Sequence, residues 1–120
     1  MKAKILVVDD SGLSRRTARR ILEEMGHQVE EAPGGAEALE HYFLNRPHLV
    51  LLDMVMDGIY GLDVLIQLRQ IDPEAKVIVV TADIQQSTQD QAKDAGACAF
   101  LNKPLNKQRL SETVTSVLET

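Results

Sequence analysis

Each of four short apolar runs ends, within two residues, at a side chain that can take part in phosphate or metal chemistry. The runs cover 5–8, 49–52, 77–80 and 97–101, and the side chains that follow them are Asp9, Asp10, Asp53, Thr81 and Lys103. Short runs of this kind indicate buried strands of a parallel sheet. Ligands bind at the edge formed by the carboxyl ends of such strands, so we expect these side chains to converge there.

This set of side chains is suited to phosphoryl transfer. Carboxylates gathered at one edge repel one another unless a positive charge lies among them. Their oxygen atoms suit a hard cation, and a site with few protein ligands suits Mg²⁺, which keeps several of its waters. The metal and Lys103 would neutralise phosphoryl oxygens, and the Thr81 hydroxyl would donate to one of them. Asp53 can then act as the nucleophile and form an aspartyl phosphate.

Each residue taken alone also has a structural interpretation. Asp9 and Asp10 could complement the dipole of a following helix. Asp53 could end its strand in a turn, Thr81 could bond its own loop, and Lys103 could be a solvated charge. Their joint occurrence at four strand ends favours the functional interpretation. The other nearby acids are interpreted as surface residues: Asp57, Asp63 and Asp83.

The rest of the chain alternates between strand and helix patterns. Expected strands cover 2–10, 28–32, 48–53, 76–80 and 97–101, and expected helices cover 11–25, 35–44, 61–70, 85–95 and 107–118. This (βα)5 alternation predicts an α/β protein with a parallel five-stranded sheet and right-handed crossovers. The second strand has one poorly buried side and is expected at an edge. Residues 54–61 are expected to form a loop, and 1–120 to form one domain.

The predicted helices differ in how much apolar surface they carry. The first has apolar residues at helical spacing, at Leu13, Ala18, Ile21, Leu22 and Met25. The second is expected to bury Ala36, Leu39 and Phe43. The fourth is very polar, with inward candidates only at Ile84, Thr88, Ala92 and Ala95. Because so little apolar area would hold it, we expect the fourth helix to be mobile or to face a partner.

Composition narrows the function classes. The 120 residues are 44% hydrophobic and 26% charged, which is typical of a globular protein. The formal net charge of −5 disfavours broad nucleic-acid binding. A local basic patch remains on the first predicted helix, and it is interpreted either as a docking site or as a solvated face: Arg15, Arg16, Arg19 and Arg20.

The single cysteine and the terminal run exclude other classes. Cys98 cannot form an internal disulfide and has no Cys or His partner at metal-ligand spacing, so it is expected to be a small core side chain. No apolar run approaches the roughly 18 residues of a membrane span. The first apolar run is too short for a signal sequence and ends in two acids. These features predict a cytoplasmic protein without membrane insertion.

Along nearly its whole length, the chain resembles a receiver domain of the two-component response regulators. The matching motifs, in order, are ILVVDDS at 5–11, LLDMVM at 51–56, GLDVL at 61–65, VVTA at 79–82, GA at 96–97 and KPL at 103–105. Each motif alone is weak evidence, and together with this spacing they are highly specific. The resemblance implies a doubly wound, flavodoxin-like sheet with strand order 2-1-3-4-5.

The resemblance also assigns roles to the strand-end residues. Asp53 would accept a phosphoryl group from a histidine kinase. Mg²⁺ would be held by Asp9, Asp10, Asp53 and the backbone carbonyl of Val55. Thr81 and Lys103 would contact phosphoryl oxygens.

A switch follows from the same resemblance. The peptide bond between Lys103 and Pro104 would be cis. Phe100 would be the aromatic switch residue, and Ala82 would leave it room to turn inward when Thr81 is drawn to the phosphate. The output face would comprise the fourth helix, the fifth strand and the fifth helix.

Two residues depart from the family pattern beside the expected phosphorylation site. Asp57 stands where many members have proline, and Tyr60 stands where a short polar residue often caps the third helix. Neither departure removes a site residue. Val55 and Asp83 occupy positions that vary in the family and tune dephosphorylation.

The leading hypothesis is a stand-alone receiver, not itself an enzyme beyond its own phosphorylation and dephosphorylation, whose output is binding to a downstream protein. Control of chemotaxis and transfer to a histidine phosphotransfer protein in a phosphorelay are both compatible with it. An alternative is a Mg²⁺-dependent aspartyl-phosphate phosphohydrolase, which Val55 disfavours because the common acid-x-acid nucleophile loop needs an acid there. Further alternatives are a receiver that only binds partners and a receiver cut from a longer regulator.

Overall fold

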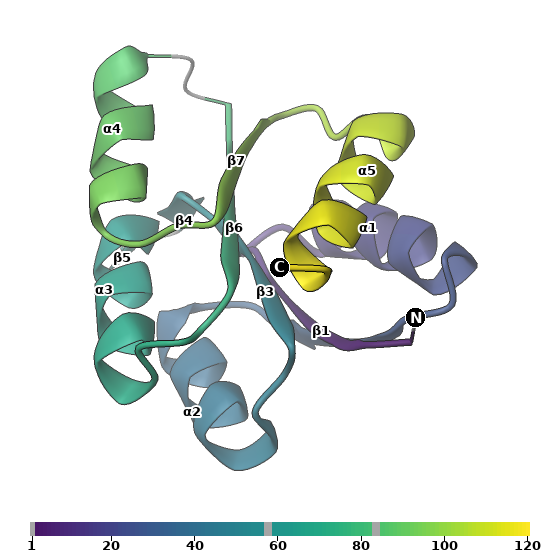
Figure 1. Cartoon of the computed structure of the whole chain (residues 1–120), viewed down its shortest axis with the longest axis horizontal. Helices are drawn as coiled ribbons and strands as arrows, with labels where there is room; N and C mark the ends of the chain where they lie inside the picture. The colour runs from purple at the N-terminus through teal and green to yellow at the C-terminus, as the bar shows by residue number, and fades with distance from the viewer. Residues whose placement is uncertain (1, 57–58, 83–84) are drawn as a thin grey trace.

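Parallel strands form a central sheet that helices cover on both faces (Figure 1). The computed structural model describes residues 2–56, 59–82 and 85–120. The strands of this sheet are β1 (Lys4–Val8), β2 (Gln28–Ala32), β3 (Leu49–Asp53), β6 (Val77–Thr81) and β7 (Ala99–Asn102). The helices are α1 (Gly12–Glu24), α2 (Gly35–Asn45), α3 (Gly61–Ile71), α4 (Gln86–Asp94) and α5 (Lys107–Leu118).

The strand order across the sheet is β2-β1-β3-β6-β7, and every pairing is parallel. Counted along the chain, this is the order 2-1-3-4-5, so the predicted doubly wound fold is confirmed. The edge position of β2 is confirmed as well. The central position of β3 matters most for the site, because it puts the end of β3 between the ends of β1 and β6.

Side chains alternate between the two faces of the sheet, as strand geometry requires. Leu6, Val50 and Val77 pack in one core with α2, α3 and α4. Ile5, Leu49 and Ile78 pack in the other core with α1 and α5. Figure 1 shows the same division, with α2, α3 and α4 on one side of the sheet and α1 and α5 on the other.

A second, small sheet follows the central strand. β4 (Val55–Met56) pairs antiparallel with β5 (Ile59–Tyr60). The prediction of a loop throughout 54–61 is therefore wrong. The sequence signal was the Asp-Gly pair at 57–58 between the dipeptides Val55-Met56 and Ile59-Tyr60, since an Asp-Gly pair of this kind is typical of hairpins. Asp57 and Asp83, predicted as surface residues, and Ile84, predicted to point inward, lie outside the described residues.

Helix α2 buries the predicted face only in part: Leu39 is partly buried against the core, but the other two predicted residues are not. Phe43 is 67% exposed and Ala36 is exposed too, whereas Ala38 and Tyr42 are buried. The Tyr42 hydroxyl donates a hydrogen bond of 2.7 Å to the Asp72 carboxylate. Because that partner satisfies the hydroxyl, the tyrosine ring can be buried at little cost.

Three other burial expectations have different outcomes. Cys98 is exposed, so its prediction as a core residue is wrong. Cys98 lies just before the edge strand β7, and its neighbour Ala97 is only half-buried. In α4 only Thr88 and Ala92 are buried, which confirms the sparse apolar face of that helix. In α1 the expected apolar residue Leu13 is 70% exposed.

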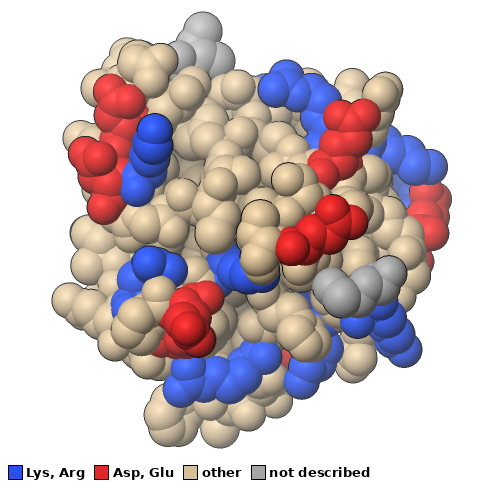
Figure 2. All heavy atoms as spheres, in the orientation of Figure 1, with Lys and Arg blue, Asp and Glu red and all other residues tan. Residues whose placement is uncertain are grey.

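Charges are mixed over the surface. Figure 2 shows Lys and Arg interspersed with Asp and Glu on the face that it draws. No helix among the described residues is long and apolar enough to cross a membrane.

Two histidines hold the beginning of β1. Nδ1 of His27 accepts a hydrogen bond of 3.1 Å from the Ala3 amide, and Nδ1 of His48 accepts one of 2.9 Å from the Lys4 amide. His27 is buried, and this burial lowers its pKa. A nitrogen that accepts a hydrogen bond carries no proton, so the contact with Ala3 requires the unprotonated Nδ1.

We predict that His27 makes the protein less stable in mild acid. Its stabilisation is fully present above the unfolded-state pKa of about 6.5 and is lost as the pH falls through the lower folded-state value, because the unfolded chain takes up the proton first. Urea unfolding at about pH 7.5 and about pH 5 should show a larger loss of stability for the parent than for His27→Gln, whose amide oxygen can accept from Ala3 without titrating. Equal losses in the two proteins would contradict the prediction.

Candidate functional site

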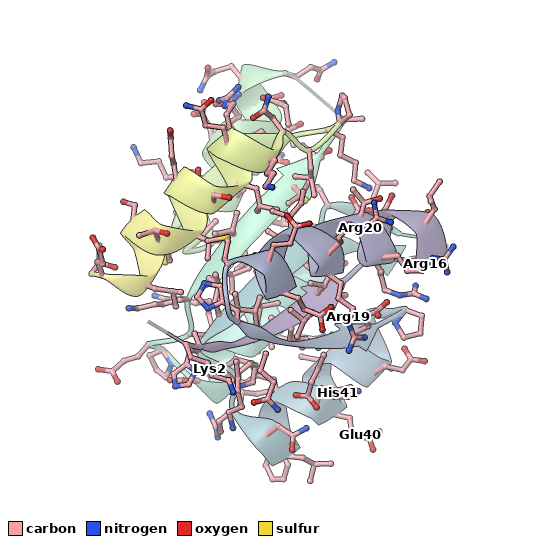
Figure 3. The ribbon with its side chains drawn as sticks, turned by 90° about the vertical axis from the view of Figure 1, so that its right-hand side faces the viewer. Lys2, Arg16, Arg19, Arg20, Glu40 and His41 are labelled. Carbon is pink, nitrogen blue, oxygen red and sulfur yellow. The ribbon has the colours of Figure 1, made fainter. Side chains whose placement is uncertain are left out.

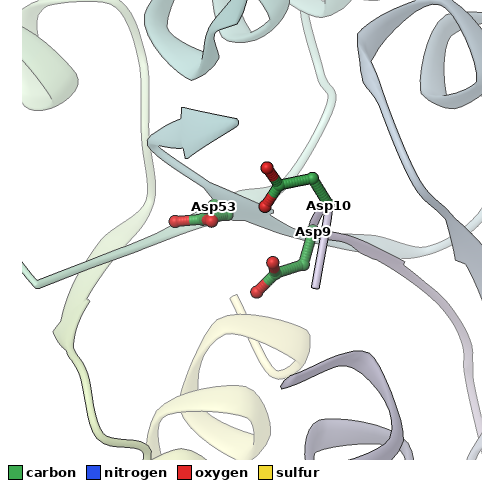
Figure 4. A group of neighbouring side chains, drawn as sticks. All are labelled: Asp9, Asp10 and Asp53. Atoms are coloured by element: carbon green, nitrogen blue, oxygen red, sulfur yellow. The ribbon is translucent and has the colours of Figure 1, made fainter. Parts of the chain in front are cut away.

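The ends of β1 and β3 bring three carboxylates together. Among the described residues, one oxygen of each of Asp9, Asp10 and Asp53 lies within 4.8 Å of the others. Asp9 and Asp53 are buried, with 5% and 6% of their surface exposed, whereas Asp10 is exposed. Figure 4 shows the three side chains around a common space. The predicted convergence of these acids at the sheet edge is therefore confirmed.

Lys103 lies between two of the acids. Its Nζ is 2.9 Å from Oδ2 of Asp9 and 3.3 Å from Oδ2 of Asp53. Burial alone would lower the pKa of Lys103, but its hydrogen bond to Asp9 and the charges of Asp53 and Asp9 outweigh burial, and the pKa is raised. The lysine therefore remains charged and supplies the positive charge that the buried carboxylates need.

Lys103 does not fully compensate the negative charge around Asp53. Burial of its carboxyl raises its pKa, and the charge of Asp9 adds to this effect, while Lys103 and the Val55 amide oppose it. The Val55 N–H donates to Oδ1 of Asp53 over 3.4 Å, which is a weak contact. Three carboxylates against one nearby ammonium leave an excess of negative charge that a divalent cation would balance.

The donor set fits Mg²⁺. Carboxylate oxygens are its preferred protein ligands, and a site with few of them leaves room for the waters that it retains. Asp9, Asp10 and Asp53 would hold the ion. Val55 lies two residues after Asp53. That its backbone carbonyl is a further ligand of the ion stays a prediction.

Asp9 is held by its own backbone and by its neighbours. Its amide donates to the Ala32 carbonyl over 3.2 Å, which continues the pairing of β1 with β2. Its Oδ1 accepts from the Ser11 amide over 2.9 Å. The side chain of Ser11 then caps α1 by accepting from the Ser14 amide. The start of α1 is thus tied to the same carboxylate that contacts Lys103.

Thr81 and the expected switch residues lie on the neighbouring strands. Thr81 ends β6, is 1% exposed, and pairs in register with Asn102 of β7. Its carbonyl accepts from the Lys103 amide over 2.8 Å. Phe100 is half-buried and packs against the core that includes Val79, its register partner. Ala82 is exposed directly after Thr81.

The turn after β7 has the predicted cis bond. The peptide between Lys103 and Pro104 is cis. Behind Asp9, Asp53 and Lys103, apolar side chains of β1, α1, β3 and β6 leave a cavity of only about 10 Å³, about the size of a single water molecule. This close packing buries the Asp53 carboxyl, and burial is the main cause of its raised pKa.

Two contacts of the site were missed in the sequence. A Cβ on Gly61 would collide with the Asp53 carbonyl and lie 2.8 Å from the Met54 Cα, so only glycine allows α3 to begin there. The guanidinium of Arg15 donates to the Asp9 carbonyl. The sequence marked Arg15 only as part of a basic patch, because a contact with a main-chain atom leaves no pattern of residue types.

The comparisons with known proteins agree with this arrangement. The family model of the response regulator receiver domain matches residues 5–115. Chemotaxis protein CheY of Thermotoga maritima is 36% identical over 118 residues, covering 98% of each chain. Chemotaxis protein CheY of Bacillus subtilis is 37% identical over 119 residues, covering 98% of this chain and 99% of its own.

A solved structure has the same fold. The response regulator receiver domain protein (CheY-like) from Methanospirillum hungatei superposes with a TM-score of 0.93 at 28% identity. The superposition covers 99% of this chain and 95% of that one.

We predict that Gly61→Ala destabilises the protein by displacing the backbone beside the Asp53 carboxylate. The added methyl group must displace the backbone of Asp53 and Met54, at a cost of about 1–3 kcal/mol in the free energy of unfolding. Urea denaturation would measure the loss. Gly12→Ala is the matched control, because a Cβ there meets only the ends of the Arg15 and Arg16 side chains, at 3.6 and 3.4 Å. A Gly61→Ala protein as stable as the control would show that the close approach is relaxed at no cost.

Proposed function

Because this chain belongs to the response regulator receiver family, we propose that it is a switch of two-component signalling in which Asp53 accepts a phosphoryl group. The donor would be a phosphohistidine of a histidine kinase or of a histidine phosphotransfer protein. The position of Lys103 carries the proposal, with Nζ at 3.3 Å from the Asp53 carboxylate and 2.9 Å from that of Asp9. A fixed cation beside the nucleophile neutralises phosphoryl oxygens without reorganising.

The transfer needs an ionised Asp53. One of its carboxylate oxygens attacks phosphorus, the new O–P bond forms, and the P–N bond to the donor histidine breaks with its electron pair left on the imidazole. Lys103 and the Val55 amide favour the ionised form of Asp53 against the burial that raises its pKa. When bound by Asp9, Asp10 and Asp53, Mg²⁺ would supply further positive charge on the transferred oxygens.

The Thr81 hydroxyl would couple the new phosphoryl group to the neighbouring strand. Thr81 ends β6 next to the end of β3, and Asp53 pairs in register with its neighbour Val80. A hydrogen bond from the hydroxyl to a phosphoryl oxygen would draw Thr81 toward Asp53. Phe100, half-buried on the adjacent strand, would then turn into the space beside Ala82. Such a local charge change can bias a surface between two arrangements.

The surface that changes would be the one formed by α4, β7 and α5. Helix α4 buries only two side chains, so few contacts resist its displacement. A hollow of about 340 Å³ separates α4 from β7, and its lining includes Phe100 and Cys98. The expected switch residue therefore borders the face that a downstream protein would bind.

The output would be protein binding and not substrate turnover. We propose that the only covalent chemistry of this chain is the gain and loss of its own phosphoryl group. Chemotaxis proteins are among its relatives over nearly their whole length, which favours a motility pathway. A phosphorelay partner would approach the modified Asp53 itself, whereas a downstream binding protein would recognise the surface formed by α4, β7 and α5.

Phosphorylation is the first test. Incubation with acetyl phosphate and Mg²⁺ should add one phosphoryl group to the parent protein, as measured by intact mass. Asp53→Asn should gain none, because the amide is no nucleophile, and EDTA should abolish the addition to the parent. If the parent gains no phosphoryl group and the stable mimic beryllofluoride also fails to bind, the proposed chemistry is wrong.

The switch can be tested apart from the chemistry. Beryllofluoride with Mg²⁺ should shift the amide NMR signals of Phe100 and of α4 in the parent. Thr81→Val has nearly the same shape but no hydroxyl, so it should still bind the mimic at Asp53 while the shifts at Phe100 largely disappear. Shifts of the same size in Thr81→Val would mean that Thr81 does not couple the site to this surface.

A further inference from the structure

Arg15 joins α1 to the backbone of the acidic turn. Its NH1 donates to the Asp9 carbonyl over 2.6 Å, and its Nε donates to Oε1 of Glu31 over 3.0 Å. The Arg15 side chain is only 19% exposed. An arginine that makes two directed bonds from one planar group is fixed in position, unlike a solvated surface charge.

Glu31 holds this arginine from the edge strand. Glu31 pairs in register with Val7 of β1, so its side chain lies on the α1 face of the sheet. Its Oε2 accepts from Arg19 over 2.7 Å while Oε1 accepts from Arg15. The hydrogen bond from Arg19 is the main cause of the lowered pKa of Glu31, so the carboxylate stays charged. Figure 3 shows Arg16, Arg19 and Arg20 along α1.

The contact with Asp9 fixes more than one residue. The Asp9 amide is bound to Ala32, its carboxylate to Ser11 and Lys103, and its carbonyl to Arg15. The carbonyl belongs to the peptide group that leads into Asp10. Because that peptide plane is rigid, holding its oxygen also limits the directions in which the Asp10 side chain can point.

We propose that Arg15 is a positioning residue of the metal site: held by Glu31, it fixes the Asp9 carbonyl and so orients the Asp9–Asp10 turn for a divalent cation. The inference deepens the proposed function, because it concerns the same Mg²⁺ site. It gives Arg15 a task distinct from docking a partner. Of the other arginines in the patch, Arg19 also binds Glu31, whereas no bond among the described residues joins Arg16 or Arg20 to Glu31 or to the Asp9 carbonyl.

The charge of Arg15 and its proposed role in orienting the ligands predict opposite effects on Mg²⁺ affinity when Arg15 is removed. Arg15 is a cation near a cation site, so removing it would tighten Mg²⁺ binding if only its charge mattered. If Arg15 orients the ligands, removing it weakens binding despite the gain in electrostatic attraction. Partners that orient metal ligands typically contribute about 10–100-fold to affinity.

The test measures Mg²⁺ affinity directly, by isothermal titration calorimetry of the parent and its variants. Arg15→Ala should raise the Mg²⁺ dissociation constant about 10-fold. Arg15→Lys keeps the charge but cannot bond both groups with one ammonium, so it should also weaken binding. Arg16→Ala is the matched control: it removes the same charge one residue away, is exposed, and should stay within about twofold of the parent because its charge is screened.

A second readout separates positioning from loss of fold. In metal-free protein, the amide NMR signals of Asp10 and Ser11 should shift in Arg15→Lys, while those of the sheet remain in place. Acetyl phosphate reactions should need more Mg²⁺ for half-maximal rate in this variant, yet approach the parent rate at saturation.

The outcomes are distinct. Mg²⁺ affinity that is unchanged or tighter in Arg15→Ala and Arg15→Lys, with the parent binding normally, overturns the positioning role and leaves the proposed function intact. A parent protein that binds no Mg²⁺ overturns both. If Arg15→Ala does not fold, Arg15→Lys and Glu31→Gln decide, since each keeps a hydrogen-bonding group at its position.

Discussion

The site depends on one ammonium group held between two buried carboxylates. Without Lys103, the buried carboxylates of Asp9 and Asp53 would lie together without the ammonium that compensates their charge, which costs several kcal/mol in the folded state. Lys103 reaches them from the far end of the chain, directly after β7. The charge balance of the site therefore requires β1, β3 and β7 to end at the same edge, which is the topology that the parallel sheet provides.

The remaining contacts restrict how the acids can move. Gly61 lets α3 begin against the backbone of Asp53, and Ser11 ties the start of α1 to the Asp9 carboxylate. Lys103 compensates the negative charge of the carboxylates, whereas these contacts fix the orientation of the acids. Together they leave Asp10, the exposed member of the group, as the acid with the most access to solvent.

The sequence predicted the sheet and the convergence of the strand-end acids with Lys103 well, because both depend on patterns of residue type. Apolar runs followed by acids mark strand ends, and alternation with helices implies the parallel order. It failed where a tertiary partner decides the outcome. Tyr42 is buried because Asp72 satisfies its hydroxyl, and local hydrophobicity favoured Phe43 instead. Cys98 was judged by residue type alone, although its place before an edge strand leaves it exposed.

The exposed position of Cys98 gives this chain a built-in attachment point for spectroscopy. It is the only cysteine of the sequence, and it borders the hollow between α4 and β7. A thiol-reactive fluorophore or spin label would therefore attach at one defined place without any substitution. From there it would sense movement of α4 in the otherwise native protein, with the acidic site at the opposite end of β7 left untouched.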